Sequence, residues 1–408
     1  MATEIPWQQL TVLLTVAIAS HFAFRRFKQP IIMGEVLIGI ILGPTILGQA
    51  IGHDYFDPTF TGIFSALGAI VLLFLIGLDS DISTIYSKKN AAIAFGGVVL
   101  PWIGGYLLTD VMLPQQTFAA KVFIGATMVA TSTAITAAIL LELKAVKTDV
   151  GRTIMGAAVI DDVLGLIVLS MSKELSVAGA IDVAGLGWLI AAAVVFIALG
   201  IFLGTKYLTK VIHWADVKGQ EYGLPHTGFT LGLGLTFFYA FASSSVGLHP
   251  IVGAFIAGAI FAKSSLIRDF QQGATYLGAI FTPIFFVSLG VQVDLWSLDT
   301  GLIVFGITLA LVAIPTKVLG CWLPARLTGS APKKSLAIGF GMAPRGEVGL
   351  VIASTALGIG VIREALYSIT TLAVLLTTII PPFIFRYYLR ESTKDELEPR
   401  LAQIEKLT

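Results

Sequence analysis

Thirteen long apolar runs, separated by short polar connections, constrain this chain more than any other feature of its sequence. The chain is 56% hydrophobic and only 12% charged, whereas a soluble domain carries roughly 25% charged residues. Each run is close to the ~20 residues that a helix needs to cross a bilayer. We therefore predict an all-α polytopic membrane protein with thirteen transmembrane helices, at residues 8–24, 31–48, 60–78, 90–112, 118–141, 150–171, 186–208, 226–246, 249–263, 274–292, 300–325, 334–358 and 365–388.

Lysine and arginine residues gather in every second connection between these spans. Of the 26 basic residues, 21 lie in one set of connections, and the opposite set holds only Lys121, Lys173 and Arg363. Because basic loops stay in the cytoplasm, we predict an outside N-terminus and a cytoplasmic C-terminus. The charged residues 391–408 are expected to form a short cytoplasmic tail. We expect a multi-pass protein of the cell (cytoplasmic) membrane of a prokaryote.

Composition also excludes several function classes. A net charge of +1 gives no field that would attract nucleic acid, and no cysteine–histidine cluster suggests zinc. No Ser-His-Asp arrangement suggests hydrolysis, and we expect no enzyme and no cofactor. An intramembrane aspartyl protease needs two aspartates on different helices that share a water, whereas the two intramembrane aspartates here are adjacent.

The chain contains a weak internal repeat. The segment 29–39 resembles 249–258, the segment 74–82 resembles 286–295, and Pro101 and Pro315 occupy similar offsets. The offset of seven spans is an odd number, so the two copies face opposite ways across the bilayer, as in many secondary transporters. We predict a transmembrane exchanger domain at 1–390, with repeats at about 30–171 and 249–388.

Two segments at corresponding positions of the repeats are poor helix formers. Residues 130–136 are rich in hydroxyl and β-branched side chains, and residues 341–349 contain Pro344 and three glycines. Such features free backbone groups from helical hydrogen bonding. Paired broken helices predict a transport site near the middle of the membrane.

Six ionisable residues fall inside the predicted spans. A charge at the centre of a bilayer costs at least ~2.5–3.5 kcal/mol, so such residues are functional candidates that should be paired. These residues are Glu35, Asp161, Asp162, Lys317, Arg345 and Glu347.

The two aspartates cannot both face the same partner, because adjacent helical residues diverge by about 100°. One is expected to face Lys317 and the other a cavity, and spacing does not say which. Arg345 would pair with Glu347 or with Glu35. Each of these charges could also form a purely structural ion pair, an alternative that stays open above all for Glu35.

An intramembrane carboxylate can hold a proton or a cation, and the competition between them is sufficient for exchange. A hard monovalent cation needs oxygen ligands. The candidates are Asp162, Asp161, the hydroxyls of Thr131 and Ser132, and freed carbonyls. His213 and His226 lie on the basic side of the membrane, where a pH-sensing role is possible in principle but an ordinary surface position is the simpler interpretation.

Five short segments resemble one known family. They are Thr131-Ser-Thr-Ala-Ile-Thr with Asp161-Asp162, Ile314-Pro-Thr-Lys-Val-Leu-Gly with Pro344-Arg-Gly-Glu, and Gly34-Glu-Val-Leu-Ile-Gly-Ile-Ile-Leu-Gly-Pro-Thr. This combination resembles the cation:proton antiporter-2 family, nearest its NapA-type sodium/proton exchangers, and the resemblance covers residues 30–388.

The resemblance implies an inverted-repeat, NhaA/NapA-like antiporter fold with two crossed broken helices, a homodimer and an elevator mechanism. It implies that Asp161 pairs with Lys317 and that Asp162 carries the cation and the proton. The pair of acids resembles the electrogenic branch of the family. Arg345 and Glu347 would form a balancing clamp, with Glu35 a further charge-compensating residue.

We therefore interpret the chain as a secondary-active antiporter of a monovalent cation, sodium in the first instance, against protons. The alternatives are a K⁺/H⁺ antiporter and a sodium-coupled symporter of an organic anion, which would need a cationic cavity. A cation channel would need a ring of acids and no Lys317, and buried acids argue against a purely structural membrane protein.

Overall fold

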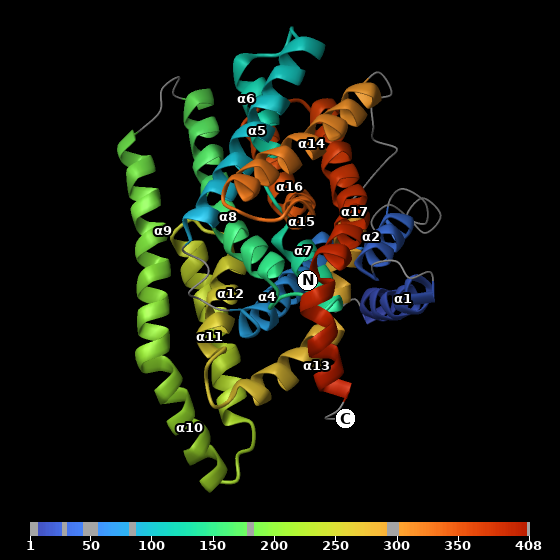
Figure 1. Ribbon diagram of the computed structural model, residues 1–408. Coiled ribbons are helices and arrows are strands. Elements are labelled where there is room, and N and C mark those ends of the chain that lie inside the picture. Colours follow the sequence, from blue (N-terminus) through green and yellow to red (C-terminus); the bar gives the residue numbers. More distant parts are fainter. Residues whose placement is uncertain are drawn as a thin grey trace, which may run out of the picture. The chain divides into compact units, whose positions relative to one another are not determined.

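The computed structural model describes residues 7–26, 31–43, 56–80, 87–177, 183–291 and 302–405. Every regular element in these ranges is helical (Figure 1). The helices are α1 (Trp7–Arg26), α2 (Ile31–Leu42), α4 (Pro58–Leu78), α5 (Lys88–Met112), α6 (Phe118–Thr127), α7 (Thr133–Glu142), α8 (Asp149–Val177), α9 (Val183–Leu203), the π-helical turn η2 (Gly204–Leu208), α10 (Thr209–Glu221), α11 (Thr227–Ser245), α12 (Pro250–Phe261), α13 (Ile267–Val291), α14 (Ile303–Leu327), α15 (Pro332–Gly341), α16 (Glu347–Gly358) and α17 (Glu364–Glu405).

Within the described ranges, seven helices are long and apolar enough to cross a membrane. They are α4, α5, α8, the continuous α9–η2–α10 segment, α13, α14 and α17. Several predicted spans correspond instead to shorter helices. Among them, spans five and twelve are each divided into two helices, α6 and α7 in the first case and α15 and α16 in the second. The all-helical class with two broken helices is confirmed, whereas the number of thirteen crossings stays a prediction.

The chain divides into two compact units. The first unit comprises residues 1–78, 201–241 and 253–297, and the second comprises 79–200, 242–252 and 298–408. In the first unit, α13 packs against α1, α2 and α4. Apolar side chains of α1 and α13, including Leu13, Ile284 and Val287, form its buried cluster.

The second unit holds both broken helices. Here α5 packs against α6, α8 and α14, and α15 packs against α14 and α17. Local sequence explains several of the helix starts: the hydroxyls of Ser87 and Thr117 accept backbone N–H bonds at the start of α5 and α6, and Pro332 opens α15. A large apolar core joins α6, α14, α16 and α17 around Phe123, Leu309 and Ile369.

Two close helix contacts in the first unit depend on glycine. A Cβ added to Gly39 of α2 or to Gly290 of α13 would lie 2.1 Å from a backbone oxygen of the other helix. The same is true between α4 and α12, where a Cβ on Gly77 or Gly258 would lie 2.3 Å or 2.1 Å from the opposite backbone. Small residues allow membrane helices to approach in this way.

The repeat in the sequence relates these two contacts. Gly39 aligns with Gly258, and Gly77 aligns with Gly290. Gly39 contacts Gly290 in one copy-to-copy contact. The repeat partners of these two residues, Gly258 and Gly77, contact each other in the second. This exchange is what a two-fold relation between the copies requires, and it agrees with an inverted-repeat fold. The exact limits of the repeats stay a prediction.

Two further segments extend beyond the sequence prediction. The seventh span, predicted at 186–208, belongs to a helical segment that continues through η2 and α10 to Glu221, because its polar residues after position 205 still form helical hydrogen bonds. The last helix, α17, continues from its apolar part to Glu405, so part of the predicted tail is helical.

Candidate functional site

The candidate site lies where the two broken helices meet in the second unit. The first break separates α6 from α7 at residues 128–132, and the second separates α15 from α16 at residues 342–346. The backbone N–H of Ser132 donates to the carbonyl of Pro344 at 2.7 Å. The hydroxyls of Thr131 and Thr136 donate to the carbonyls of Met342 and Gly341 at 2.9 and 2.6 Å.

These bonds explain how a broken helix survives in an apolar environment. In the absence of water, each freed backbone group needs a partner inside the protein. Here each break supplies partners for the other. The fit is tight, since a Cβ on Gly346 would lie 2.7 Å from the Ser132 hydroxyl oxygen.

The charge pair predicted between span six and span eleven is present. Lys317 of α14 donates to Asp161 Oδ1 of α8 at 2.8 Å, and neither side chain has any exposed surface. Lys317 also donates to the carbonyl of Val129 at 2.7 Å. The ammonium group therefore lies between a carboxylate and the C-terminal end of α6, where the helix dipole favours a cation.

The two carboxylate oxygens of Asp161 differ in their surroundings. Oδ1 accepts the lysine bond, whereas Oδ2 is buried and has no hydrogen-bond partner among the described atoms. A buried carboxylate oxygen without a partner is costly, so such an atom marks a position for a ligand or a proton.

Asp162 occupies the adjacent position on α8 and has a different environment. It is half-buried, and the Thr133 hydroxyl lies 3.5 Å from its Oδ2. Thr133 is the first residue of α7. Its hydroxyl was not among the predicted ligands, although it belongs to the hydroxyl-rich segment 130–136. Asp161 thus faces Lys317, and Asp162 lies towards the start of α7.

Arg345 is fully buried and binds backbone rather than a described carboxylate. Its guanidinium donates to the carbonyls of Met128, Ala343 and Ala313 at 3.0, 3.2 and 3.2 Å. It therefore links the end of α6 and the middle of α14 to its own break. The sequence instead predicted a carboxylate partner, because backbone carbonyls freed by the breaks cannot be located from residue types alone.

The structure gives less information on the two remaining predicted residues, Glu347 and Glu35. Glu347 is the first residue of α16, but its side chain lies outside the described part of the structure. Glu35 belongs to α2 of the first unit, where its side chain is buried. The proposed pairing of Arg345 with either glutamate stays a prediction.

The site offers oxygen ligands rather than a metal cluster. No group of three or more His, Cys, Asp or Glu side chains that could hold a metal ion occurs among the described residues. A cation at this site would depend on the two aspartates together with hydroxyl and carbonyl oxygens, a set that suits a hard ion held loosely.

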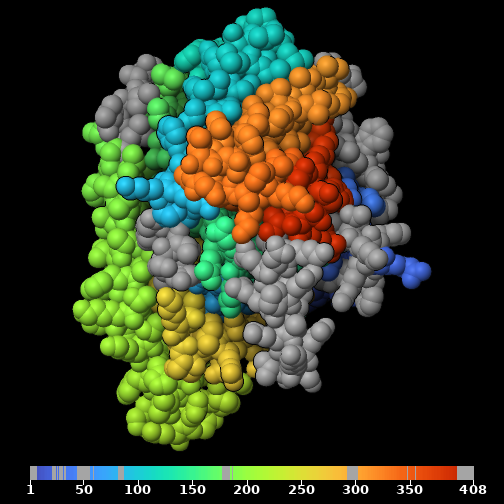
Figure 2. Space-filling view, in the orientation of Figure 1, coloured from blue at the N-terminus to red at the C-terminus, as the bar shows by residue number. Residues whose placement is uncertain are grey.

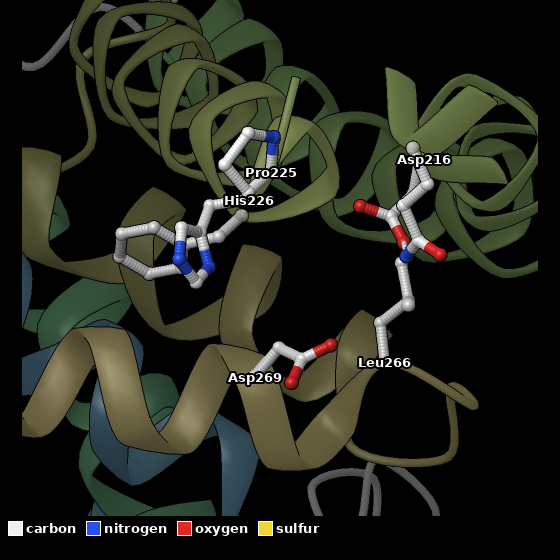
Figure 3. A pocket seen from close by; sticks show the side chains of 7 residues that line it. Asp216, Pro225, His226, Leu266 and Asp269 are labelled. Atoms are coloured by element: carbon white, nitrogen blue, oxygen red, sulfur yellow. Dashed lines mark hydrogen bonds between the residues drawn. The ribbon is translucent and has the colours of Figure 1, made fainter. Parts of the chain in front are cut away.

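The two histidines of the basic side lie in the first unit. His213 forms a 3.2 Å hydrogen bond with Ser265. His226 has a positive φ of 63° and lines a cavity of about 230 Å³ with Asp216 and Asp269. Figure 3 shows these three side chains, which come from α10, the α10–α11 connection and α13.

Comparison with known proteins agrees with this geometry. The family model of the sodium/hydrogen exchanger transmembrane domain matches residues 10–391. The chain is 32% identical to the Na(+)/H(+)-K(+) antiporter GerN of Bacillus cereus, over 95% of this chain and 97% of that protein. It is also 32% identical to a Na(+)/H(+) antiporter of Enterococcus hirae, over 93% of this chain and 97% of that protein.

A solved structure is similar throughout. The sodium proton antiporter MjNhaP1 from Methanocaldococcus jannaschii superposes with a TM-score of 0.65, at 19% identity, over 96% of this chain and 97% of that one. This similarity confirms the antiporter fold. Since the family model covers nearly the whole chain, this protein belongs to the sodium/hydrogen exchanger family of transmembrane proteins.

Proposed function

We propose that this protein exchanges sodium for protons across a cell membrane, with Asp162 as the exchange carboxylate. One observation carries the proposal. Lys317 occupies a single oxygen of Asp161, which leaves Oδ2 buried and without a described partner beside half-buried Asp162. Asp162, the next residue of α8, adds a second carboxylate beside this ion pair, and a proton or a monovalent cation can neutralise it.

Competition for this charge produces exchange. A carboxylate poorly exposed to water is unfavourable in its ionised form unless a cation binds it. Either a proton or sodium therefore occupies Asp162 while the site changes sides. Thr131, Thr133 and the freed carbonyls supply neutral oxygens to the ion without adding charge. Ser132 lies at the same break and completes the candidate set.

We further propose an electrogenic cycle that moves two protons for each sodium ion. Asp162 releases one proton when sodium binds. Sodium also attracts Asp161, and Lys317, having lost its counter-ion, releases the second proton. The bond of Lys317 to Asp161, which is adjacent to Asp162 on α8, supports this coupling. Transport would then carry one net positive charge in the direction of the protons.

An elevator motion is proposed for alternating access. The described side chains of the site, on α8, α14 and the two breaks, all belong to the second unit. A unit that carries the whole site can move it as a rigid body. We also propose a homodimer, and a membrane orientation in which the basic connections, together with the helical segment that contains Lys206 and Lys210, lie in the cytoplasm.

The test is exchange in proteoliposomes driven by a pH gradient, with Na⁺, Li⁺ and K⁺ compared by a pH-sensitive dye. Wild type should dissipate the gradient on addition of Na⁺, and Asp162→Asn should abolish this response. Lys147→Gln, which removes an exposed ion pair with Asp79, is the matched control and should retain exchange. Full exchange by Asp162→Asn would refute the site.

Potassium is the second candidate ion, because the Bacillus cereus relative is named as a Na(+)/H(+)-K(+) antiporter. A yeast relative, 28% identical over 97% of this chain and 47% of that protein, is named as a K(+)/H(+) antiporter. The assay separates the candidates directly, since an equal response to K⁺ and Na⁺ would remove the sodium assignment. A sodium-coupled symporter would give no response of the pH gradient to added Na⁺. A channel would appear as an uncoupled leak.

A further inference from the structure

A pocket on the basic side of the first unit has the chemistry of an anion site. It is an open groove of about 420 Å³ between one face of α10 and the connection between α12 and α13. Lys210, His213, Trp214 and Val217 occupy i, i+3, i+4 and i+7 of α10, and Ser264 and Ser265 close the opposite side. This pocket combines a lysine with several hydrogen-bond donors.

The donors of this pocket are available to a ligand. Lys210 is exposed, and no acidic side chain in the described ranges pairs with it. His213 Nδ1 lies 3.2 Å from the Ser265 hydroxyl. When Ser265 donates this bond, the proton of the imidazole lies on Nε2, which can then donate to a ligand.

The surroundings of the pocket favour a ligand that comes from the membrane. Trp214 is 64% exposed and Tyr207 is 50% exposed, and aromatic side chains of this kind are enriched at the interface between lipid and water. In Figure 2 the yellow-green side chains of α10 lie on the surface. The Gly187–Glu221 segment has 35 residues, so at 1.5 Å per residue it is about 52 Å long and exceeds the ~30 Å hydrocarbon core.

The neighbouring cavity on α10 has the opposite character. It is lined by Asp216 and Asp269 together with His226 (Figure 3). Asp216 is buried and accepts a 2.8 Å bond from the Gly228 backbone N–H at the start of α11. An anion would be repelled there, so the charges on α10 direct an anionic group to the Lys210 face only.

We propose that the Lys210 pocket binds the phosphate of an anionic phospholipid in the leaflet on the basic side of the membrane. The Lys210 ammonium and the His213 Nε2–H donate to the phosphate oxygens, and Ser265 orients the imidazole through its bond to Nδ1. Trp214 and Val217 contact the glycerol and the upper acyl chains. Lys206, which lies over the rings of Phe202 and Tyr207 at 5.0 and 5.4 Å, adds positive charge on the preceding turn. This site is independent of the ion-exchange site in the second unit.

The experiment uses the full chain in nanodiscs of phosphatidylcholine with increasing phosphatidylglycerol, and compares brominated-chain forms of each lipid. The signal is the part of the tryptophan emission that Trp214→Phe removes. We expect brominated phosphatidylglycerol to quench this signal at a lower mole fraction than brominated phosphatidylcholine. Lys210→Gln should reduce the preference about fivefold, the contribution of one basic residue near an anionic membrane surface.

The matched control is Lys218→Gln on the same helix, where Lys218 already pairs with Glu221 at 2.6 Å. This variant removes the same charge and should keep the preference. An unchanged preference in Lys210→Gln, or an equal loss in Lys218→Gln, would overturn the site. Loss of the preference in a few millimolar inorganic phosphate would overturn the lipid assignment and identify a site for free phosphate.

Discussion

The buried pair between Lys317 and Asp161 gives the sharpest quantitative prediction. Neither side chain is exposed, and the pair is joined by a 2.8 Å hydrogen bond. Removal of one partner from a buried ion pair costs ~3–5 kcal/mol, because the remaining charge loses its compensation. Lys317→Gln and Asp161→Asn should therefore each destabilise the protein by about this amount.

The double variant Asp161→Asn/Lys317→Gln should be less destabilised than the sum of the two single variants. It leaves two neutral amides at hydrogen-bonding distance and no uncompensated charge. We expect a coupling energy of about 2–3 kcal/mol, the upper range for residues in one network. Lys147→Gln serves as the control, because its ion pair with Asp79 is partly exposed and should contribute ~0–1 kcal/mol.

The assay is thermal unfolding of purified protein in one detergent, followed by tryptophan emission at a fixed heating rate. At ~2 °C per kcal/mol, each single variant should unfold about 6–10 °C below wild type. Parallel proteoliposome assays should show loss of exchange in both single variants. Strictly additive effects in the double variant, or single variants as stable as wild type, would show that the pair does not hold α8 and α14 together.

Three further predictions rest on other parts of the structure. Arg345→Lys should destabilise the protein by about 2–4 kcal/mol and impair exchange, because the one nitrogen of an ammonium cannot occupy the three separate positions from which Nε, Nη1 and Nη2 donate to carbonyls. Thermal unfolding and transport test this. Gly258→Ala should destabilise by ~1–3 kcal/mol through overpacking. Gly62→Ala, which lies in α4 with nothing within 4 Å, should instead stabilise by about 0.5–1 kcal/mol, because alanine favours the helix more than glycine does; unfolding midpoints test both. The hydrogen bond to Glu391 raises the pKa of Lys333 in the folded protein. The bond therefore stabilises the folded state at pH below the unfolded-state pKa of Lys333, and this stabilisation is lost as the pH rises through the folded-state pKa. High salt should remove the effect, and an unfolding midpoint that depends on pH equally in Lys333→Gln and wild type would contradict it.

Several features of the site could be predicted from the sequence because they depend on residue type. Pro344 and its glycines prevent a continuous helix, and the hydroxyl-rich segment 130–136 weakens the other one. The second break, at 342–346, lies within the segment 341–349, and the first, at 128–132, overlaps the start of the segment 130–136. Adjacent aspartates in an apolar span indicated an ion site for a similar reason, since their cost in a membrane requires a compensating function.

The partners of these residues could not be predicted in the same way. Spacing showed that only one aspartate could face Lys317, and the resemblance to a known family, rather than geometry, selected Asp161. The carbonyl partners of Arg345 appear only when the ends of α6 and α14 are placed in three dimensions. Thr133 is the first residue of α7, and its hydroxyl lies near Asp162. This contact could not be predicted, because the start of a helix cannot be located to one residue from the sequence pattern alone.

The predicted lengths of the helices were too short where hydropathy alone defined their ends. Hydropathy ends a span where polar residues begin, near position 208, whereas helical hydrogen bonding continues to Glu221. The difference has a functional consequence. The extra turns of α10 carry Lys210 and His213, so the segment that hydropathy assigned to a connection is the one that carries the proposed anion pocket. The polar end of a long membrane helix can thus bind lipid while its apolar part spans the bilayer.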